Sequence, residues 1–325
     1  MTKAIRIHQH GGPEAMVWDE VEVGTPGPGQ VRLKQHAVGL NFIDVYHRTG
    51  LYPVGPLPAI LGMEGAGEVT ALGEGVAGLK IGDSVAYAMA PMGSYAEERL
   101  YPAERLVKLP EGIDTKHAAA MMLQGMTAEY LIRRTCAVKE GDTILVHAAA
   151  GGVGLILCQW ARHIGATVIG TVGSKEKAEL ASAHGCAHPI FYTAEDFQKR
   201  VRELTGGKGV RVVYDGIGKD TFDASLDCLA PRGMMVSFGN ASGPVPPFEL
   251  LKLSQKGSLF ITRPSLAAYT STREELLESS GALFDLVLKG AVKIEVNQTY
   301  ALKDAAQAHR DLESRKTTGS SVLIP

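Results

Sequence analysis

The residues best suited to chemistry form a glycine-rich turn between an apolar run and an amphipathic run. The turn reads Ala149-Ala150-Gly151-Gly152-Val153-Gly154, with an apolar run at 143–146 before it and an amphipathic run at 155–164 after it. A strand, a tight turn and a helix N-terminus in this order place a pyrophosphate over free backbone N–H groups. In the G-x-G-x-x-G pattern, Ala149 occupies the first glycine position. Gly151, at the second, would let the backbone approach the phosphates. Gly154, at the third, would let the helix pack on the strand. We expect Gly151, Gly152 and Val153 to contact the pyrophosphate.

The next apolar run, 166–172, ends in Gly173-Ser174-Lys175-Glu176-Lys177, with no acid at the position that reads a ribose 2′-hydroxyl. A carboxylate there would repel a 2′-phosphate, whereas Ser174 and Lys177 can donate hydrogen bonds to one. The alternative is a glycine turn followed by a solvated lysine pair. Because strand, turn, helix and second strand all fall in register, the sequence predicts an NADP(H) site, with Tyr192 at its adenosine end.

The elements that position these residues alternate between strands and helices. Two helices are expected at 116–123 and 127–135. They precede the series of alternating strands and helices. The expected strands are 143–148, 166–172, 188–192, 210–215, 233–238 and 258–262, and the expected helices are 153–164, 175–184, 194–204, 219–228 and 272–289. Alternating strand and helix units predict a parallel sheet covered on both faces, which is a doubly wound α/β domain.

The remaining sequence predicts a second, β-rich domain. Runs of alternating character at 30–34, 67–72 and 83–88 are separated by glycine and proline clusters. The tail predicts an amphipathic helix at 303–314 and a short strand at 320–324. We therefore expect the tail to rejoin the first domain. That makes 1–125 with 265–325 one domain and 126–264 the other, with a ligand cleft between the two.

Composition excludes several classes of function. A formal net charge of −2 over 325 residues provides no electrostatic footprint for nucleic acid or an anionic membrane. No apolar run approaches the roughly 20 residues that span a bilayer, and the first residues lack the apolar core of a signal peptide. The four cysteines stand far apart, without a C-x-x-C pair. This pattern is typical of reduced thiols in a cytoplasmic protein and argues against a zinc knuckle.

Several motifs together resemble one known family over essentially the whole chain. The glycine turn follows Gly62-Met63-Glu64-Gly65-Ala66-Gly67-Glu68-Val69 and Gly82-Asp83-Ser84-Val85 in the order seen in medium-chain dehydrogenases/reductases. Asn41-Phe42-Ile43-Asp44-Val45-Tyr46, Arg263-Pro264-Ser265-Leu266 and the C-terminal residues are similar to the zinc-free quinone oxidoreductases related to zeta-crystallin. The resemblance implies a Rossmann nucleotide-binding domain with a β-rich, GroES-like catalytic domain, and a homodimer in which 257–261 forms an edge strand.

The positions that hold catalytic zinc in the alcohol dehydrogenases differ here. Asn41 stands near the cysteine position, and the Gly-His-Glu motif reads Gly62-Met63-Glu64. These residues cannot supply the nitrogen and sulfur ligands that zinc prefers, and no metal is expected. Without a Lewis acid, dehydrogenation of simple alcohols becomes unfavourable, so the hydride acceptor must already be electrophilic.

A quinone meets that requirement, because its reduction yields a stabilised phenolate that water can protonate. The resemblance places Asn41, Tyr46 and Tyr52 around the acceptor, with Met63 and Thr127 nearby, and Tyr46 could hydrogen-bond to the carbonyl oxygen. For Tyr46 and Tyr52 the alternative is a half-buried aromatic pair. For His147 a structural role is expected. The resemblance also carries over a set of cofactor contacts: Phe42, Ile43, Asp44, Val45, Tyr46, Tyr130, Gly173, Lys175, Ile217, Phe238, Gly239, Asn240, Ala241, Arg263, Pro264, Ser265 and, in the tail, Arg315.

Two other functions stay open at this point. The first is an NADPH-dependent reductase of α,β-unsaturated aldehydes or ketones, which would need a better-placed proton donor than a quinone reductase does. The second is a binding protein, since zeta-crystallin relatives serve as lens proteins and some are proposed to bind AU-rich RNA. Near-neutral charge and the absence of a basic, aromatic stripe argue against RNA.

Overall fold

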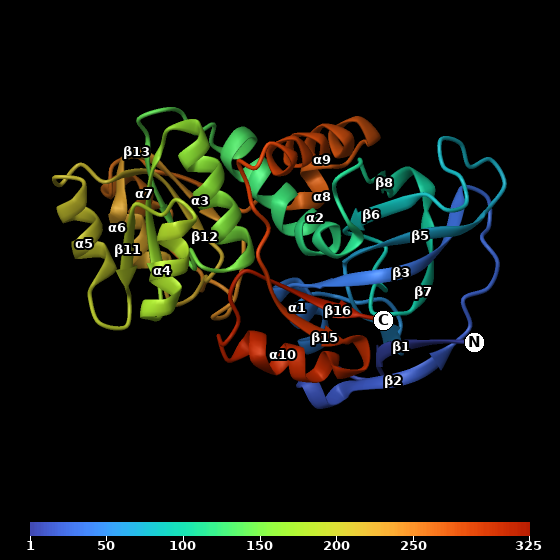
Figure 1. Cartoon of the computed structure of the whole chain (residues 1–325). Helices are drawn as coiled ribbons and strands as arrows, with labels where there is room; N and C mark the ends of the chain where they lie inside the picture. The colour runs from blue at the N-terminus through green and yellow to red at the C-terminus, as the bar shows by residue number, and fades with distance from the viewer. The chain divides into compact units, whose positions relative to one another are not determined.

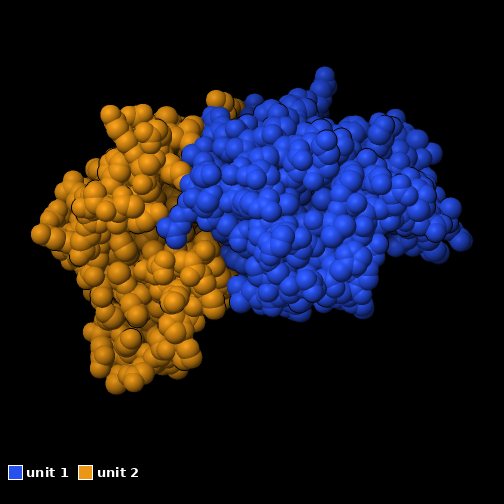
Figure 2. Space-filling model, turned by 90° about the horizontal axis from the view of Figure 1, so that it is seen from below, with its two compact units in different colours: residues 1–126, 269–288, 294–325 blue, residues 127–268, 289–293 orange.

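The computed structural model describes the whole chain, Met1–Pro325, and the chain divides into two compact units. Unit 1 contains Met1–Met126, Tyr269–Leu288 and Ile294–Pro325, and unit 2 contains Thr127–Ala268 and Lys289–Lys293 (Figure 2). Unit 1 is therefore assembled from three segments of the chain.

Unit 2 is built on a six-stranded sheet in which every neighbouring pair is parallel. Its strands are β9 (Thr143–Val146), β10 (Thr167–Val172), β11 (His188–Phe191), β12 (Val210–Asp215), β13 (Leu229–Ser237) and β14 (Phe260–Thr262). They lie in the order β11-β10-β9-β12-β13-β14, so the strand order reverses beside β9, the first strand of the sheet in the chain. This is the doubly wound topology, which confirms the predicted fold class, and such sheets bind ligands at the carboxyl ends of their strands near this reversal.

Helices connect the parallel strands of unit 2 (Figure 1). They are α3 (Gly152–Ile164), α4 (Lys175–Ala183), α5 (Phe197–Leu204), α6 (Phe222–Cys228), α7 (Leu251–Gln255) and α8 (Leu266–Tyr269), whose last residue belongs to unit 1. The core beneath them is aliphatic and includes Leu145, Ile169, Val213 and Leu226. The short helices α7 and α8 were not predicted, because neither is long enough to show a helical period.

Unit 1 contains a seven-stranded sheet and a three-stranded sheet. The larger sheet comprises β3 (Gln30–Leu40), β5 (Glu64–Leu72), β6 (Ser84–Ala88), β7 (Glu98–Pro102), β8 (Val107–Lys108), β15 (Val296–Ala301) and β16 (Ser320–Ile324). The smaller sheet comprises β1 (Thr2–Ile7), β2 (Met16–Val21) and β4 (Ala59–Ile60). β16, the last strand of the chain, pairs antiparallel with β3 near the beginning, as the register Val322 to Gly39 shows. The tail therefore completes the sheet that the N-terminal third begins.

The helices of unit 1 include one in a region where the sequence indicated only strands and turns. The helices are α1 (Phe42–Thr49), α9 (Arg273–Leu288), α10 (Ala305–Glu313) and most of α2 (Thr115–Glu129), whose last three residues belong to unit 2. Short 3₁₀ turns are η1 (Pro13–Ala15), η2 (Ala103–Arg105) and η4 (Leu302–Asp304), and α2 continues in unit 2 as a π-helical segment, η3 (Tyr130–Thr135). Helix α1 begins with a capping box between Asn41 and Asp44 and ends at Gly50, which adopts φ 81°.

Two further observations concern the whole chain. No helix is both long and apolar enough to cross a membrane. All four cysteines (Cys136, Cys158, Cys186 and Cys228) are buried as free thiols.

Candidate functional site

In unit 2, the glycine turn lies between β9 and α3, as the sequence predicted. Ala148 adopts φ 52°, and its carbonyl accepts a hydrogen bond from the N–H of Gly151 at 2.9 Å. A Cβ on Gly154 would lie 2.3 Å from the Ala148 carbonyl oxygen, so this position requires glycine for close packing of helix on strand. Gly151 is the N-cap of α3, and no side chain caps the first turn. The N–H groups of that turn have no partner within the helix and suit an anionic group.

The second anion-binding candidate is the start of α4. Ser174 is the N-cap, and its hydroxyl oxygen accepts a hydrogen bond from the backbone N–H of Lys177 at 3.3 Å. The same hydroxyl hydrogen-bonds the exposed Glu176 carboxylate. Lys175 lies on the exposed face and approaches Glu179 at 3.9 Å. A 2′-phosphate at this turn would compete with Glu176 for the Ser174 hydroxyl.

Gly173 and Tyr192 lie together at the carboxyl ends of β10 and β11. These strands are neighbours, with Val172 opposite Phe191 in the register. A Cβ on Gly173 would meet the Tyr192 hydroxyl at 2.9 Å, so the glycine makes room for the tyrosine. Tyr192 is 40% exposed. The structure therefore brings both residues to one edge of the sheet.

The segments after β12 and β13 pack against each other at the same edge. The N–H of Phe238 donates to the Asp215 carbonyl at 2.8 Å, and the N–H of Ala241 donates to the Gly216 carbonyl at 3.2 Å. A Cβ on Gly239 would lie 2.4 Å from the Gly216 carbonyl oxygen. The buried Asp215 carboxylate accepts from the N–H of Ile217 at 2.7 Å and thereby holds this turn. Asn240 lies between Gly239 and Ala241 in the same segment.

Other predicted contacts of unit 2 lie at the end of β14 and near the start of the unit. Arg263 donates from Nη1 to the Ser237 carbonyl at 3.1 Å, which ties the end of β14 to the end of β13, and Pro264 and Ser265 follow directly. Thr127 and Tyr130 are buried at the end of α2 and the beginning of the π-helical segment η3. Segments of this kind occur often at functional sites.

His147, next to the glycine turn, is a structural imidazole. It is buried, with Nδ1 2.9 Å from the Thr171 hydroxyl and Nε2 2.8 Å from the Ser225 hydroxyl. Burial lowers the pKa of His147, because the low-dielectric surroundings disfavour the imidazolium. Both ring nitrogens are thus used within unit 2.

In unit 1, Asn41 is the centre of a buried chain of polar side chains. Its Nδ2 donates to Glu64 Oε2 at 2.7 Å, and its Oδ1 accepts from Gln124 Nε2 at 3.1 Å. Gln124 Oε1 in turn accepts from the Ser320 hydroxyl at 2.7 Å. The N–H of Leu123 donates to Glu64 Oε1 at 2.6 Å. Elements from the beginning, middle and end of the chain therefore fix the Asn41 amide.

Two buried carboxyl groups flank Asn41. Asp44 Oδ2 accepts from the Asn41 backbone N–H at 2.9 Å and from the Tyr95 hydroxyl at 3.1 Å. Burial raises the pKa of Asp44 to about 7, against the hydrogen bonds from Asn41 and Tyr95 that lower it. Burial also raises the pKa of Glu64 to about 8, and the negative charge of Asp44 adds to this rise. Both groups can hold a proton near neutral pH.

The predicted aromatic residues form a cluster on and after α1. The rings of Tyr46 and Tyr52 meet edge to face with centroids 5.1 Å apart, and Phe42 lies 6.3 Å from Tyr46. Tyr46 and Val45 are buried, Tyr52 and Ile43 are half-buried, and Met63 is buried directly before β5. The aromatic pair that the sequence offered as the alternative is thus present, on and after a helix, and the role of Tyr46 and Tyr52 as substrate contacts stays a prediction.

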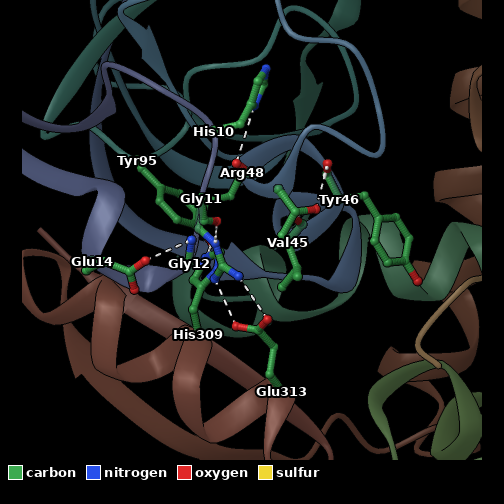
Figure 3. A network of polar contacts seen from close by, with 11 residues as sticks. His10, Gly11, Gly12, Glu14, Val45, Tyr46, Arg48, Tyr95, His309 and Glu313 are labelled. Atoms are coloured by element: carbon green, nitrogen blue, oxygen red, sulfur yellow. Dashed lines mark hydrogen bonds and ion pairs between the residues drawn. The ribbon is translucent and has the colours of Figure 1, made fainter. Parts of the chain in front are cut away.

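Arg48 connects α1 to the C-terminal helix α10. Its guanidinium is 1% exposed, donates to both carboxylate oxygens of Glu313 at 2.8 and 2.9 Å, and contacts His309 Nδ1 at 2.9 Å (Figure 3). Its Nε donates to the Gly11 carbonyl at 3.1 Å. Arg315 follows two residues after Glu313, is exposed and adopts φ 60°. Arg48 therefore anchors the end of the helix that precedes Arg315.

Sequence reasoning missed the roles of Glu64, Gln124, Ser320, Arg48 and His309. The sequence did carry a signal for α1, because Asn at the N-cap and Asp at N3 form a capping box and Gly50 is a typical helix end. No local signal identifies Gln124 or Ser320 as partners of Asn41, since 83 residues separate Gln124 from Asn41. Asp44, predicted as a cofactor contact, directs its side chain into the interior of unit 1.

No group of three or more histidine, cysteine, aspartate or glutamate side chains lies together in the chain to hold a metal ion. Asn41 and Met63, at the positions of the zinc ligands in the alcohol dehydrogenases, contact other parts of unit 1 instead. The Asn41 amide is occupied by Glu64 and Gln124, and the Met63 carbonyl accepts from the N–H of Met89 at 2.7 Å.

The comparison with known proteins agrees with this architecture. Residues 27–111 match the family model described as an alcohol dehydrogenase GroES-like domain, and residues 152–278 match the model described as a zinc-binding dehydrogenase. A quinone oxidoreductase of Pseudomonas aeruginosa is 53% identical over 325 residues, which cover 100% of both chains. The chain belongs to the quinone oxidoreductase family. The predicted membership of the medium-chain dehydrogenases/reductases, and within them of the quinone oxidoreductases, is thereby confirmed.

Two other members of this group of similar proteins bear on function. The crystal structure of Escherichia coli quinone oxidoreductase complexed with NADPH superimposes with a TM-score of 0.98 at 50% identity, covering 99% of this chain and 100% of that one. A 2-haloacrylate reductase of a Burkholderia species is 52% identical over 331 residues, covering 100% of this chain and 99% of the relative. The family therefore includes proteins named for two kinds of electron-poor acceptor.

Proposed function

We propose that the protein is an NADPH:quinone oxidoreductase, which transfers two electrons from NADPH to a quinone. The observation that carries this proposal is the full-length similarity to quinone oxidoreductases, one of which is complexed with NADPH. The balanced reaction consumes one quinone, one NADPH and one proton and yields a hydroquinone and NADP⁺. When bound, NADPH supplies the hydride for this reaction.

The residues of unit 2 fit such a cofactor. The uncapped first turn of α3 supplies N–H donors for the pyrophosphate, and Gly154 lets this helix start pack closely on the turn. Ser174 and Lys177 supply a hydroxyl and an ammonium group for a 2′-phosphate, and Tyr192 lies beside them for the adenosine end. The segments 215–218 and 238–241 border the same edge of the sheet, where a doubly wound fold receives its ligand.

The residues of unit 1 fit the acceptor. Asn41 and Tyr46 can donate hydrogen bonds to a carbonyl oxygen that gains negative charge, and Tyr52 holds the Tyr46 ring. Because a hydroquinone anion is stabilised by its ring, water can deliver the last proton. The protein contributes orientation and exclusion of water. Met63, the other α1 residues and Arg315 complete the proposed set of contacts in unit 1.

A second candidate is the reduction of a carbon–carbon double bond next to a carbonyl or carboxyl group. The similarity to a 2-haloacrylate reductase favours it. Such a reaction forms an enolate and needs a proton donor. The sequence did not reveal one, whereas the structure contains two buried carboxyl groups beside Asn41 whose pKa values are raised to about 7 and about 8.

The two candidates separate in one assay of the full-length protein. NADPH oxidation is followed by absorbance with p-benzoquinone, a trans-2-enal and 2-chloroacrylate as parallel acceptors. We expect fast turnover with the quinone and little with the other two. Turnover with the enal or the haloacrylate alone would replace the first candidate by the second.

We also propose a homodimer in the cytoplasm. Strand β14 lies at the edge of the sheet, as predicted, and Phe260 on it is 57% exposed, with Leu250 and Leu251 exposed nearby in the sequence. Edge strands with exposed apolar side chains tend to pair with a second copy. Sedimentation equilibrium should give twice the mass of one chain, and a monomeric mass would contradict the dimer.

A further inference from the structure

The Asn41 amide can be held in two opposite orientations, because each of its ends faces a side chain that can reverse its role. As the structure shows it, the chain of hydrogen bonds runs from the Ser320 hydroxyl to Gln124, from Gln124 to Asn41 and from Asn41 to Glu64. Every donor in this chain points toward the Glu64 carboxylate. A carboxylate without a proton only accepts hydrogen bonds, so it fixes the direction of the whole chain.

The position of a proton on Glu64 is restricted by the backbone. Glu64 Oε1 accepts from the N–H of Leu123 at 2.6 Å, and a backbone N–H can only donate. A proton on Glu64 must therefore sit on Oε2, the oxygen that faces Asn41 at 2.7 Å. The O–H on Glu64 Oε2 and the N–H on Asn41 Nδ2 would then face each other as two donors, unless the Asn41 amide turns over.

The reversed chain again pairs Glu64, Asn41, Gln124 and Ser320 with one another, although the Asn41 oxygen then no longer faces the Asp44 N–H of the capping box. Protonated Glu64 donates to Asn41 Oδ1, the Asn41 amide donates to Gln124 Oε1, and the Gln124 amide donates to the Ser320 hydroxyl oxygen. No heavy atom has to leave its place, because amide oxygen and nitrogen exchange positions by a half-turn of the side chain. The four residues are all buried, so water does not compete for these bonds.

The surroundings of Glu64 allow both states at neutral pH. Burial and the charge of Asp44 raise its pKa to about 8, and the other ionisable group near it is the Tyr95 phenol, whose pKa burial raises far above neutral. Gly39 on β3 leaves the space for the carboxyl group, since a Cβ there would lie 2.1 Å from Glu64 Oε2. From α2, the Leu123 backbone N–H donates to it.

We infer that Glu64 is a positioning residue whose protonation sets the direction of the Asn41–Gln124–Ser320 chain, and hence which end of the Asn41 amide is free to contact the substrate. With Glu64 ionised, the second N–H of Asn41 lies on the Glu64 side; with Glu64 protonated, the amino group turns to the Gln124 side. The link to catalysis rests on the proposed function, which takes Asn41 as a contact of the acceptor. The effect of Glu64 on the orientation of the Asn41 amide is argued only from contacts within unit 1.

The orientation can be measured without cofactor or acceptor. The chain has only three asparagines, Asn41, Asn240 and Asn297, so ¹⁵N-asparagine labelling gives three pairs of side-chain amide signals in NMR spectra of the full-length protein. The Asn41→Asp variant assigns the Asn41 pair by its loss. In the wild type we expect the Asn41 signals to move with pH, with a midpoint near the Glu64 pKa of about 8, while the signals of Asn240 and Asn297 serve as references.

The variants isolate Glu64 from its neighbours. Glu64→Gln must present its oxygen to the Leu123 N–H and its amino group to Asn41, which mimics protonated Glu64. Its Asn41 signals should stay at the low-pH position at every pH. Glu68→Gln, the same substitution on the same strand, should titrate like the wild type. Asp44→Asn removes a like charge and should lower the midpoint without abolishing the movement.

Three outcomes would overturn the inference: Asn41 signals in the wild type that do not move with pH, Glu64→Gln signals that follow the wild type, and loss of the movement in Asp44→Asn. The first and third of these outcomes can be measured even if the Glu64→Gln variant does not fold. Kinetics then test the link to catalysis. We expect kcat/KM for p-benzoquinone to differ about tenfold between wild type and Glu64→Gln at about pH 9 and to agree within about twofold at about pH 6. If the Asn41 signals depend on Glu64 but kcat/KM does not differ between wild type and Glu64→Gln, then Asn41 does not belong to the proposed acceptor site.

Discussion

The Tyr95 hydroxyl lies 2.9 Å from His309 Nε2, although 214 positions separate the two residues in the sequence. The direction of this contact follows from Arg48, which contacts the other ring nitrogen of His309 and can only donate. His309 Nδ1 therefore accepts, and its Nε2–H donates to the Tyr95 oxygen. The Tyr95 hydroxyl is then left to donate to Asp44. One arginine thus fixes the hydrogen-bond order from the C-terminal helix to the first turn of α1.

Replacing Arg48 by methionine should destabilise the fold. The substitution leaves His309 Nδ1 and the Gly11 carbonyl without their donor inside unit 1 and breaks the paired contact with Glu313. We expect the free energy of unfolding to fall by about 3 kcal/mol, because two acceptors inside unit 1 lose their hydrogen-bond donor. Urea denaturation measures this change. Arg310→Met, on an exposed position of the same C-terminal helix, should lie close to the wild type, and equal effects of the two substitutions would contradict the anchoring role.

Stability should decrease as the solution becomes more alkaline. Burial raises the pKa of Asp44 to about 7 and that of Glu64 to about 8, from ordinary values of 3.8 and 4.5. A raised pKa means that the folded state holds the proton more tightly. The stability from each group is therefore complete below its ordinary pKa and is lost as the pH rises through the raised one. Between about pH 6 and about pH 9 we expect a loss on the order of 4 kcal/mol from the two groups together.

Urea denaturation of wild type and Glu64→Gln at both pH values tests this account, because the variant lacks the Glu64 contribution. The variant should lose less stability than the wild type over the same interval. A parallel loss in the two proteins would mean that Glu64 titrates alike in the folded and unfolded states.

Gly154→Ala should distort the glycine turn. The added Cβ would lie 2.3 Å from the Ala148 carbonyl oxygen and 2.8 Å from atoms of Ala149, and neither backbone can yield. We expect a loss of about 2 kcal/mol in the free energy of unfolding and weaker NADPH binding by fluorescence titration. Gly281→Ala in α9 is the matched control, because a Cβ there meets nothing within 4 Å. That substitution should raise stability by about 0.5 to 1 kcal/mol.

Lys177→Asp should change the choice between the two nicotinamide cofactors. An acid in the first turn of α4 would repel a 2′-phosphate, while a free 2′-hydroxyl tolerates it. We expect KM for NADPH to rise by about tenfold or more and KM for NADH to change by less than about twofold. Steady-state kinetics with both cofactors provides the measurement, with Lys199→Asp, an exposed lysine of α5 outside the proposed contacts, as the control. An equal rise for both cofactors would refute the 2′-phosphate role.

The strands and main helices of unit 2 follow from the sequence, because buried parallel strands and amphipathic helices leave a local periodic pattern. Thus 210–215 was predicted as a strand with the bounds that β12 has. Helix α1 was missed because the apolar residues of its eight positions were interpreted among the surrounding strands, although its capping box was visible. The glycine turn was found because its spacing reflects a local requirement of the backbone.

The polar interior of unit 1 could not be predicted in the same way. Asn41 was singled out as a site residue, but its partners Glu64 and Gln124 lie 23 and 83 positions away, and Arg48 meets Glu313 after 265 positions. Such pairs depend on how β3, α2, α10 and β16 come together, and no local pattern of a single sequence encodes that. Likewise, the raised pKa of Glu64 is a consequence of burial that appears only after folding.

We expect the protein to couple NADPH oxidation to quinone reduction. The most direct test follows NADPH and hydroquinone together after p-benzoquinone is added to the full-length protein. We predict enzyme-dependent turnover in which one hydroquinone appears for each NADPH consumed, with NADH a much poorer donor. NADPH loss no faster than in the absence of protein, or loss without formation of hydroquinone, would contradict the account.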